Sequence, residues 1–229
     1  MRRIASHKAL LPTGTVDRPL VTLDGDRIVS IGSYRTEELD RMGGVEFHAG
    51  MLIPSMVDAH CHLELSYLRG AIAPGGGFAD FAAGMARERG RFTEGQRLEA
   101  MRRADSELWD GGVGAVGDIA NGATSFTVKA SSRIRYRTFA EIFGLRTAST
   151  SQAEALLGYP DTTPTPHSTY SLQDDVFRAV CNDGRRSPLS IHFMETPAEA
   201  ELYRGGGALH DWYATQGFTC DFLHYGSPA

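Results

Sequence analysis

The sequence predicts an α/β fold built on a parallel sheet, and two observations support this prediction. From about residue 51 onward, short apolar runs typical of buried strands alternate with amphipathic segments typical of helices. Such alternation indicates βα units and therefore a parallel sheet. Polar residues also follow the apolar runs at corresponding places, as expected where the carboxyl ends of parallel strands share one face. Residues 1–50 carry short β-rich runs and turns instead, so we expect two parts, 1–50 and 51–229.

The composition limits the classes of function. The chain has 229 residues, 41% of them apolar, and a formal net charge of −5, so it can bury a sizeable core. Its Lys and Arg residues are scattered, which argues against binding to nucleic acid or to an anionic membrane surface. No apolar run approaches the roughly 20 residues that span a bilayer, and three widely spaced cysteines are poor material for disulfides. We therefore expect a cytoplasmic protein.

The strands are predicted from apolar runs and turn signals. Residues 19–34 contain two β-rich runs around Asp24-Gly25-Asp26, which is a strong hairpin signal. Six segments in the second part are expected as strands, namely 51–57, 112–121, 136–144, 161–171, 188–196 and 218–226. The fourth of these contains two prolines, so its regular part must be short.

Three helices are predicted from their capping signals. The segment 93–111 begins with a capping-box pair, Thr93 and Gln96, and continues with apolar residues at helical spacing. A second helix is expected after Ser171. A third begins at Thr196, with Pro197 at the first helical position and Glu199 completing another capping box.

Histidines at the strand ends indicate a metal site. His60 and His62 are one residue apart behind the first apolar run, so both imidazoles leave the strand on the same face. A further histidine from another strand would supply a third donor, and His167 and His192 lie in later runs. Three imidazoles suit a divalent ion, with zinc first and iron or manganese as alternatives. Cys61 should point the opposite way and pack.

Other polar residues at the strand ends have alternative explanations. A buried histidine is more often a hydrogen-bonded core residue than a ligand. Asp118 is explained equally well as a helix cap or as a substrate contact. Glu141 could instead pair with an arginine such as Arg137. His224 is either a further metal ligand or part of a linker, and Tyr170 is expected in the core.

Four motifs in order resemble the amidohydrolase superfamily. "LIPSMVDAHCHLELSYLRG" resembles its first strand, "GVGAVGDIAN" the second, "PTPHSTYS" its His-Ala-Pro-Tyr-Ser segment, and "IHFMET" its fifth-strand His-x-x-Glu-Thr. The branch that the motifs resemble most contains chlorohydrolases, S-adenosylhomocysteine deaminase and aminodeoxyfutalosine deaminase. The resemblance implies a (β/α)8 TIM-type barrel accompanied by a small β-sandwich, to which the N-terminal segment would contribute.

The resemblance also implies roles for single residues. His60, His62 and His192 would bind one metal ion, Glu195 would shuttle protons, and His167 would contact the substrate. Glu64 could also reach the substrate pocket. These roles imply a metal-dependent hydrolase that deaminates an amino-heterocycle such as a purine-like base, through a metal-activated water. Hydrolysis of a cyclic amide or removal of chloride from a triazine-like ring is the alternative within enzymes.

The chain departs from the family pattern in its length. An eight-stranded barrel needs about 250 residues, or 200 when trimmed, and the 229-residue chain has room for a partial barrel of five or six βα units. The family's strand-eight aspartate has no counterpart. We therefore expect the chain alone to be inactive and to self-associate or to pair with the missing C-terminal half. A non-catalytic, truncated chain that self-associates is the alternative of another class.

Overall fold

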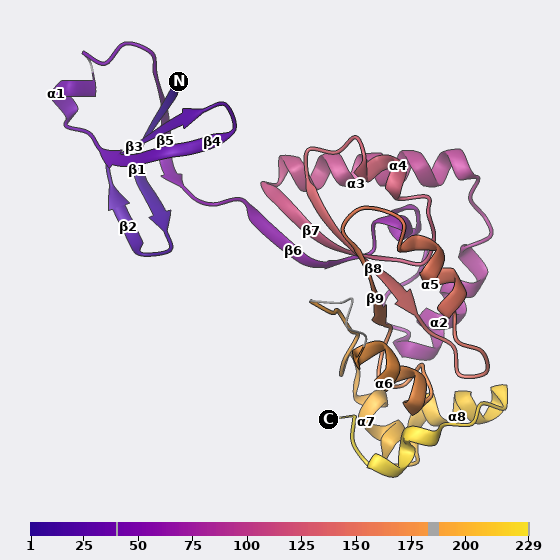
Figure 1. Ribbon diagram of the computed structural model, residues 1–229. Coiled ribbons are helices and arrows are strands. Elements are labelled where there is room, and N and C mark those ends of the chain that lie inside the picture. The colour runs from indigo at the N-terminus through magenta and orange to yellow at the C-terminus, as the bar shows by residue number, and fades with distance from the viewer. Residues whose placement is uncertain (40, 183–187, 229) are drawn as a thin grey trace. The chain divides into compact units, whose positions relative to one another are not determined.

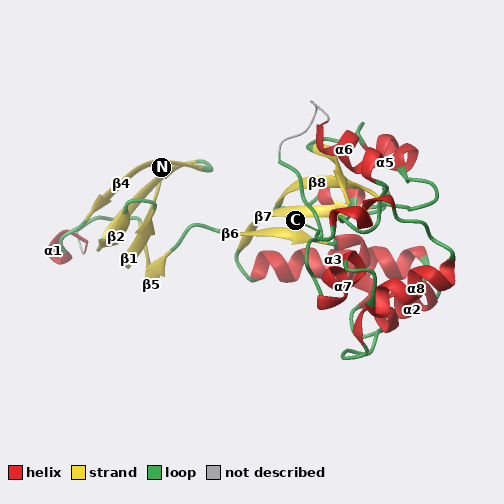
Figure 2. Ribbon diagram, turned by 90° about the horizontal axis from the view of Figure 1, so that it is seen from below, coloured by secondary structure: helices red, strands yellow, loops and turns green. Residues whose placement is uncertain are grey.

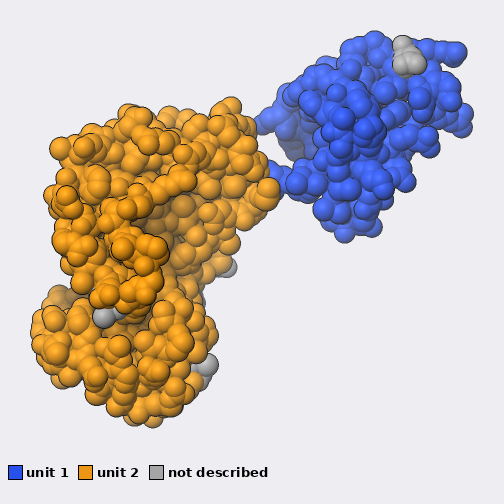
Figure 3. All heavy atoms as spheres, turned by 180° about the vertical axis from the view of Figure 1, so that it is seen from behind, with its two compact units in different colours: residues 1–55 blue, residues 56–229 orange. Residues whose placement is uncertain are grey.

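The protein consists of two compact units, Met1–Ser55 and Met56–Ala229 (Figure 3). A computed structural model describes residues 1–39, 41–182 and 188–228. Because the two units make most of their contacts internally, each is described by itself. In the part of the chain so described, no helix is long and apolar enough to cross a membrane.

The first unit is a five-stranded β-sheet. Its elements are β1 (Arg2–Leu11), β2 (Gly14–Asp17), β3 (Pro19–Asp24), β4 (Arg27–Ser33), α1 (Thr36–Leu39) and β5 (Val45–Leu52). The strand order is β2-β1-β3-β4, and β5 pairs with β1 in parallel. The predicted hairpin is confirmed, because β3 and β4 are antiparallel and Asp24 pairs with Arg27. Gly25, in the two-residue connection, has a φ of +59°, a backbone conformation that favours glycine.

The second unit is built on a four-stranded parallel sheet (Figure 1). Its strands lie in the order β6 (Met56–Cys61), β7 (Val113–Ala120), β8 (Arg135–Ile142) and β9 (Thr162–Pro166). Each strand is joined to the next through helical segments, so the predicted α/β fold with a parallel sheet is confirmed. The parallel strands bring their carboxyl ends to one edge, which is where the histidines lie.

Helices pack against the apolar side chains of this sheet. Figure 2 shows them in red around the yellow strands and beyond the sheet. They are α2 (Gly77–Glu88), α3 (Glu94–Asp110), α4 (Phe126–Lys129), α5 (Thr150–Leu156), α6 (Asp174–Asn182), α7 (Pro197–Tyr203) and α8 (Gly207–Gln216), with 3-10 turns η1 (Leu63–Leu68) and η2 (Asp221–Tyr225). The capping box of α3 is confirmed, with both Thr93–Gln96 bonds formed. The capping box of α7 is wrong: the Thr196 side chain makes no cap bond, because the Glu199 carboxylate accepts from Thr169 and the Glu195 N–H instead.

Residues 188–196 and 218–226, predicted as the fifth and sixth strands, do not form strands. Near the fifth, His192 makes only an isolated bridge with Ser168 beside the end of β9. Among the described residues, no further strand lies beyond this segment to extend the ladder. Residues 221–225 form η2 instead of a strand. The Asp221 carboxylate accepts the Asp174 N–H, and Phe222 packs against Tyr203 of α7, so contacts with helices hold this segment.

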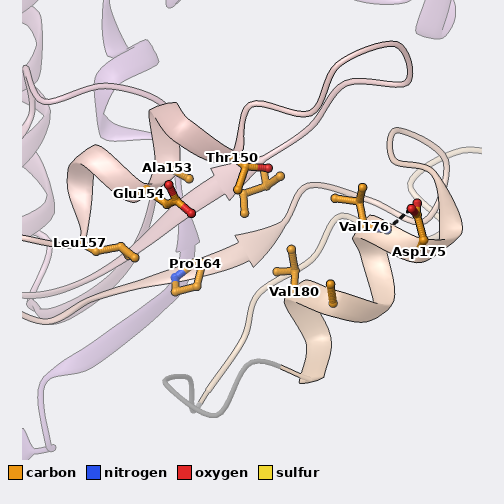
Figure 4. Close-up of a pocket in the computed structure, with 10 residues that line it drawn as sticks. Thr150, Ala153, Glu154, Leu157, Pro164, Asp175, Val176 and Val180 are labelled. Carbon is orange, nitrogen blue, oxygen red and sulfur yellow. Dashed lines mark hydrogen bonds between the residues drawn. The ribbon is translucent and has the colours of Figure 1, made fainter.

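A groove of about 340 Å³ lies between α5 and α6, over the ends of β8 and β9 (Figure 4). Ile142 of β8 lines it, together with Pro164 and Val180. Successive side chains of a strand point to opposite faces, so Ile142 and its neighbour Glu141 diverge. Glu141 approaches His192. The groove therefore lies on the face of the sheet opposite the histidines.

Candidate metal centre

Three imidazoles converge at the carboxyl end of the parallel sheet. His60 lies in β6, His62 is the N-cap residue of η1, and His192 lies beside the end of β9. The Nε2 atom of His192 is 3.1 Å from Nε2 of His60 and 2.9 Å from Nε2 of His62. The ligand atoms of all three lie within 4.8 Å of one another. The structure thus brings together the three residues that the sequence predicts as ligands.

The opposite ring nitrogens of two of these histidines have partners that fix their orientation. His192 Nδ1 is 3.0 Å from the backbone oxygen of His167. A carbonyl only accepts hydrogen bonds, so Nδ1 carries the proton and Nε2 presents its lone pair. His60 Nδ1 lies 3.1 Å from Ser190 Oγ. Such contacts behind a ligand set its tautomer and ring orientation.

The backbone that carries His60 and His62 is held by β7. Gly117 lies against β6 so closely that a Cβ there would be 2.6 Å from Ala59 O. Asp118 Oδ1 accepts the Leu63 N–H at 2.7 Å, at the first residue of η1. Asp118 Oδ2 is 2.5 Å from the Lys129 ammonium. Asp118 therefore caps the segment after the histidines, which was one of its two predicted roles.

Burial favours the neutral form of His60, His62 and His167. Burial, followed by the proximity of His192, lowers the pKa of His62 to about 3 and that of His167 to about 3. The same two causes lower the pKa of His60. Neutral imidazole is the form that binds a metal ion.

The donor set fits a divalent metal ion. Two zinc–nitrogen bonds of about 2.0–2.1 Å at a tetrahedral angle separate the nitrogens by about 3.3–3.4 Å. The observed separations of 2.9 and 3.1 Å are within a few tenths of an ångström of that value. Three neutral imidazoles with converging lone pairs are a common zinc donor set.

Glu195 follows His192 in the chain and is held by two hydrogen bonds, one with Tyr170 and one with Glu199. The Tyr170 hydroxyl donates to Glu195 Oε2 at 2.8 Å, and the Glu195 N–H donates to Glu199 Oε2 at 3.3 Å. Met194, just before it, has a φ of +53°, which turns the chain sharply between the metal ligand and Glu195. The side chain itself is exposed.

His167 lies directly against His192. Its ring stacks on His192 with centroids 4.7 Å apart, and its Nδ1 is 2.9 Å from both Ser168 Oγ and Ser171 Oγ. With Glu141 and His192, it forms a second group whose potential ligand atoms lie within 4.8 Å of one another.

Glu64 is tied to the loop after β7. Its two carboxylate oxygens accept the backbone N–H groups of Asn121 and Gly122 at 3.0 and 3.1 Å. Burial is the largest effect on the carboxyl and raises its pKa. The backbone of Asn121 and Gly122 therefore fixes the Glu64 carboxylate. Any contact of this carboxylate with a substrate uses the lone pairs that these two hydrogen bonds leave free.

Two further residues contribute to the centre, and one of them, Ser190, had no signal in the sequence. Ser190 contacts His60, and Glu141 places Oε1 at 3.6 Å from His192 Nδ1 while Asn121 donates to its other oxygen. Burial raises the pKa of Glu141. The position of Glu141 at a strand end was the only available signal. His224 lies in η2 and belongs to neither group of potential metal ligands found among the described residues.

Comparison with known proteins gives one curated relative and several similar folds. No family model matches the sequence. An adenosine deaminase of Helicobacter pylori is 26% identical over 197 residues, which cover 77% of this chain and 46% of the relative. The chain thus spans about half the length of the curated relative it matches.

Solved structures share the fold at low identity. An aminofutalosine deaminase of Helicobacter pylori, in complex with methylthio-coformycin, has a TM-score of 0.79 at 23% identity, over 93% of this chain and 56% of that one. An atrazine chlorohydrolase of Arthrobacter aurescens, complexed with zinc, has a TM-score of 0.69 at 14% identity, over 99% and 58%. The chain is thus similar to a curated deaminase over about half of that protein's length, and these solved structures share its fold.

Proposed function

We propose that this chain carries the metal-binding portion of a hydrolase that deaminates an amino-heterocycle, such as a purine-like base. The observation that carries the proposal is the convergence of three imidazoles at the end of a parallel sheet. The names of the curated relative and of the aminofutalosine deaminase, both deaminases, support the reaction class. Removal of chloride from a triazine-like ring is the second candidate, supported by the likeness to the atrazine chlorohydrolase.

Each residue of the site has a proposed role. His60, His62 and His192 hold one divalent ion, with zinc first and iron or manganese as alternatives. When bound, such an ion supplies a water whose pKa is lowered to about 7. The Glu195 carboxylate accepts a proton and passes it to the leaving amine, as a general base and then a general acid. His167 and Glu64 face the substrate.

The remainder of the architecture is proposed on the same family likeness. The four-stranded sheet represents part of a (β/α)8 barrel, and residues 1–50 represent part of a β-sandwich. Met56 and Val57 of β6 are 53% and 67% exposed. Within residues 56–182 and 188–228, no strand pairs with the outer edge of β6. Open edges and exposed apolar side chains favour association, so we propose that β6 pairs with a second copy or with the remaining half of a barrel.

The experiment is an assay of ammonia and chloride release from aminopurines and chlorotriazines, with zinc-loaded protein in a full-length context and its Glu195→Gln variant. We expect ammonia release that falls by about 10²–10⁴ in the variant, the usual contribution of general acid–base catalysis. Glu154→Gln is the matched control, because Glu154 is exposed and lines the groove on the other face.

The outcomes separate the candidates. Chloride release without ammonia release would favour the second candidate. No release of either product from zinc-loaded protein, also after addition of any remaining half, would favour a non-catalytic chain. Normal turnover in Glu195→Gln, with a slightly lower melting temperature, would indicate that Glu195 only favours the start of α7, an effect of under about 1 kcal/mol.

A further inference from the structure

We infer that Tyr170 is a positioning residue that holds the Glu195 carboxylate in the orientation needed for proton transfer. This inference rests on the proposed function of Glu195. The Tyr170 hydroxyl donates to Glu195 Oε2 at 2.8 Å. Tyr170 is 3% exposed, whereas Glu195 is exposed. A buried, fixed donor therefore meets a carboxylate that solvent would otherwise leave free to rotate.

Tyr170 is itself rigidly placed. Its ring lies edge-on to His167 and to Phe78, and its backbone oxygen accepts the Tyr213 hydroxyl at 2.8 Å. Tyr213 lies in α8 and is buried in the same apolar cluster. The phenol consequently has little freedom to follow the carboxylate. It is the carboxylate that must adapt to the phenol.

A second contact fixes the backbone of Glu195. Glu199 is 1% exposed, and its two oxygens accept the Glu195 N–H and the Thr169 hydroxyl. The backbone and one carboxylate oxygen of Glu195 are thus held by different partners. Two fixed points on one residue define the direction of its free oxygen, Oε1.

This arrangement has a chemical consequence for the two carboxylate oxygens. Oε2 accepts the phenolic hydrogen bond, so Oε1 is the oxygen available to accept a proton and release it. The phenol keeps its own proton throughout, because burial and the adjacent Glu195 carboxylate raise the pKa of Tyr170. Tyr170 therefore orients the proton carrier and is not a proton carrier itself.

The test compares Tyr170→Phe with Tyr203→Phe. Tyr203 is the matched control, because it is also buried and donates its hydroxyl to the backbone oxygen of Thr169, without touching Glu195. The first readout is the side-chain carboxyl ¹³C resonance of Glu195 in metal-free protein labelled with ¹³C-glutamate, assigned by its loss in Glu195→Gln. We expect this resonance to shift in Tyr170→Phe and to stay in place in Tyr203→Phe.

The second readout is turnover of the zinc-loaded protein in a full-length context. We expect kcat to fall about 10-fold or more in Tyr170→Phe, in line with the cost of misplacing a reacting group, while KM and zinc content stay within about twofold. An unmoved Glu195 resonance, an equal response in Tyr203→Phe, or an unchanged kcat would overturn the inference. If no variant releases ammonia but the resonance responds as expected, the proposed function fails and the positioning contact stands.

Discussion

Replacing Lys129 with methionine should strongly destabilise the second unit. The side chains of Lys129 and Asp118 are 6% and 0% exposed, and Nζ and Oδ2 are 2.5 Å apart. Removing the ammonium leaves the Asp118 carboxylate buried without its opposite charge. Breaking a buried pair in this way costs about 3–5 kcal/mol. We expect a loss of that size at pH 8.

The same loss should shrink in acid. Burial already raises the pKa of Asp118 in spite of Lys129, and removing the ammonium raises it further. The folded variant then binds a proton at Asp118 more readily than the folded wild type does, so its stability relative to wild type falls as pH rises through the two folded pKa values, which both lie above the usual value of about 3.9. The destabilisation should be smaller at pH 5.5 than at pH 8.

The assay is urea unfolding of metal-free protein, with the midpoint shift converted at constant m-value. Asp118→Asn combined with Lys129→Met should recover to within about 2 kcal/mol of wild type, because no buried charge remains. Arg69→Met is the matched control, since the Arg69–Glu107 pair is exposed on both sides and should contribute less than about 1 kcal/mol. A loss below about 1 kcal/mol in Lys129→Met, or no recovery in the double variant, would refute the assignment of Asp118 as a buried structural anchor.

Further predictions concern the backbone beneath the histidines, the charge state of the imidazoles and the association of the chain. In Gly117→Ala, the new Cβ would meet Ala59 O at 2.6 Å. We expect the free energy of unfolding in urea to fall by about 1–3 kcal/mol, as overpacking does, and zinc binding to weaken. An unchanged zinc affinity would contradict this. The pKa of His167 is lowered to about 3 in the folded protein, whereas in the unfolded chain it is about 6.5. Below about pH 6.5 the unfolded chain therefore binds a proton at His167 that the folded protein does not bind. Acidification then reduces the free energy of unfolding by about 1.4 kcal/mol per pH unit. The stability difference between wild type and His167→Gln, measured without metal from pH 7 to pH 4, should decline accordingly, and a constant difference would reject the neutral histidine. Light scattering should show an assembly larger than the 24.9 kDa monomer, and a compact monomer would argue against pairing at β6.

Local signals in the sequence could predict much of the fold. The Thr93–Gln96 capping box and the Asp24-Gly25 turn are determined by neighbouring residues, and both form as expected. The convergence of His60 and His62 follows from strand periodicity together with the parallel order of the sheet.

Features that depend on tertiary contacts could not be predicted. The Thr196 capping box fails because Thr169 and the Glu195 N–H compete for the Glu199 carboxylate. The segment around His192 makes one bridge instead of a strand, because strand formation requires a neighbour on each side or a longer ladder.

Side-chain pairs distant in sequence were equally inaccessible. The ion pair between Asp118 and Lys129 depends on how α4 packs on β7, and the contact of Tyr170 with Glu195 joins residues from separate loops. Sequence alone indicated Tyr170 as a core residue. It is buried as expected, but its hydroxyl has a polar partner that no sequence pattern signalled.

Metal content tests the central claim most directly. The test is elemental analysis of protein purified without chelator, in the wild type and in a His60→Ala/His62→Ala double variant. The control is His48→Ala/His210→Ala, because these histidines lie in β5 and α8 and belong to neither group of potential metal ligands among the described residues. We expect about one zinc, iron or manganese ion per chain in the wild type and the control. The double variant should retain almost none, because it keeps one of three imidazole donors. Equal metal content in the double variant and the wild type would contradict a metal centre formed by His60, His62 and His192.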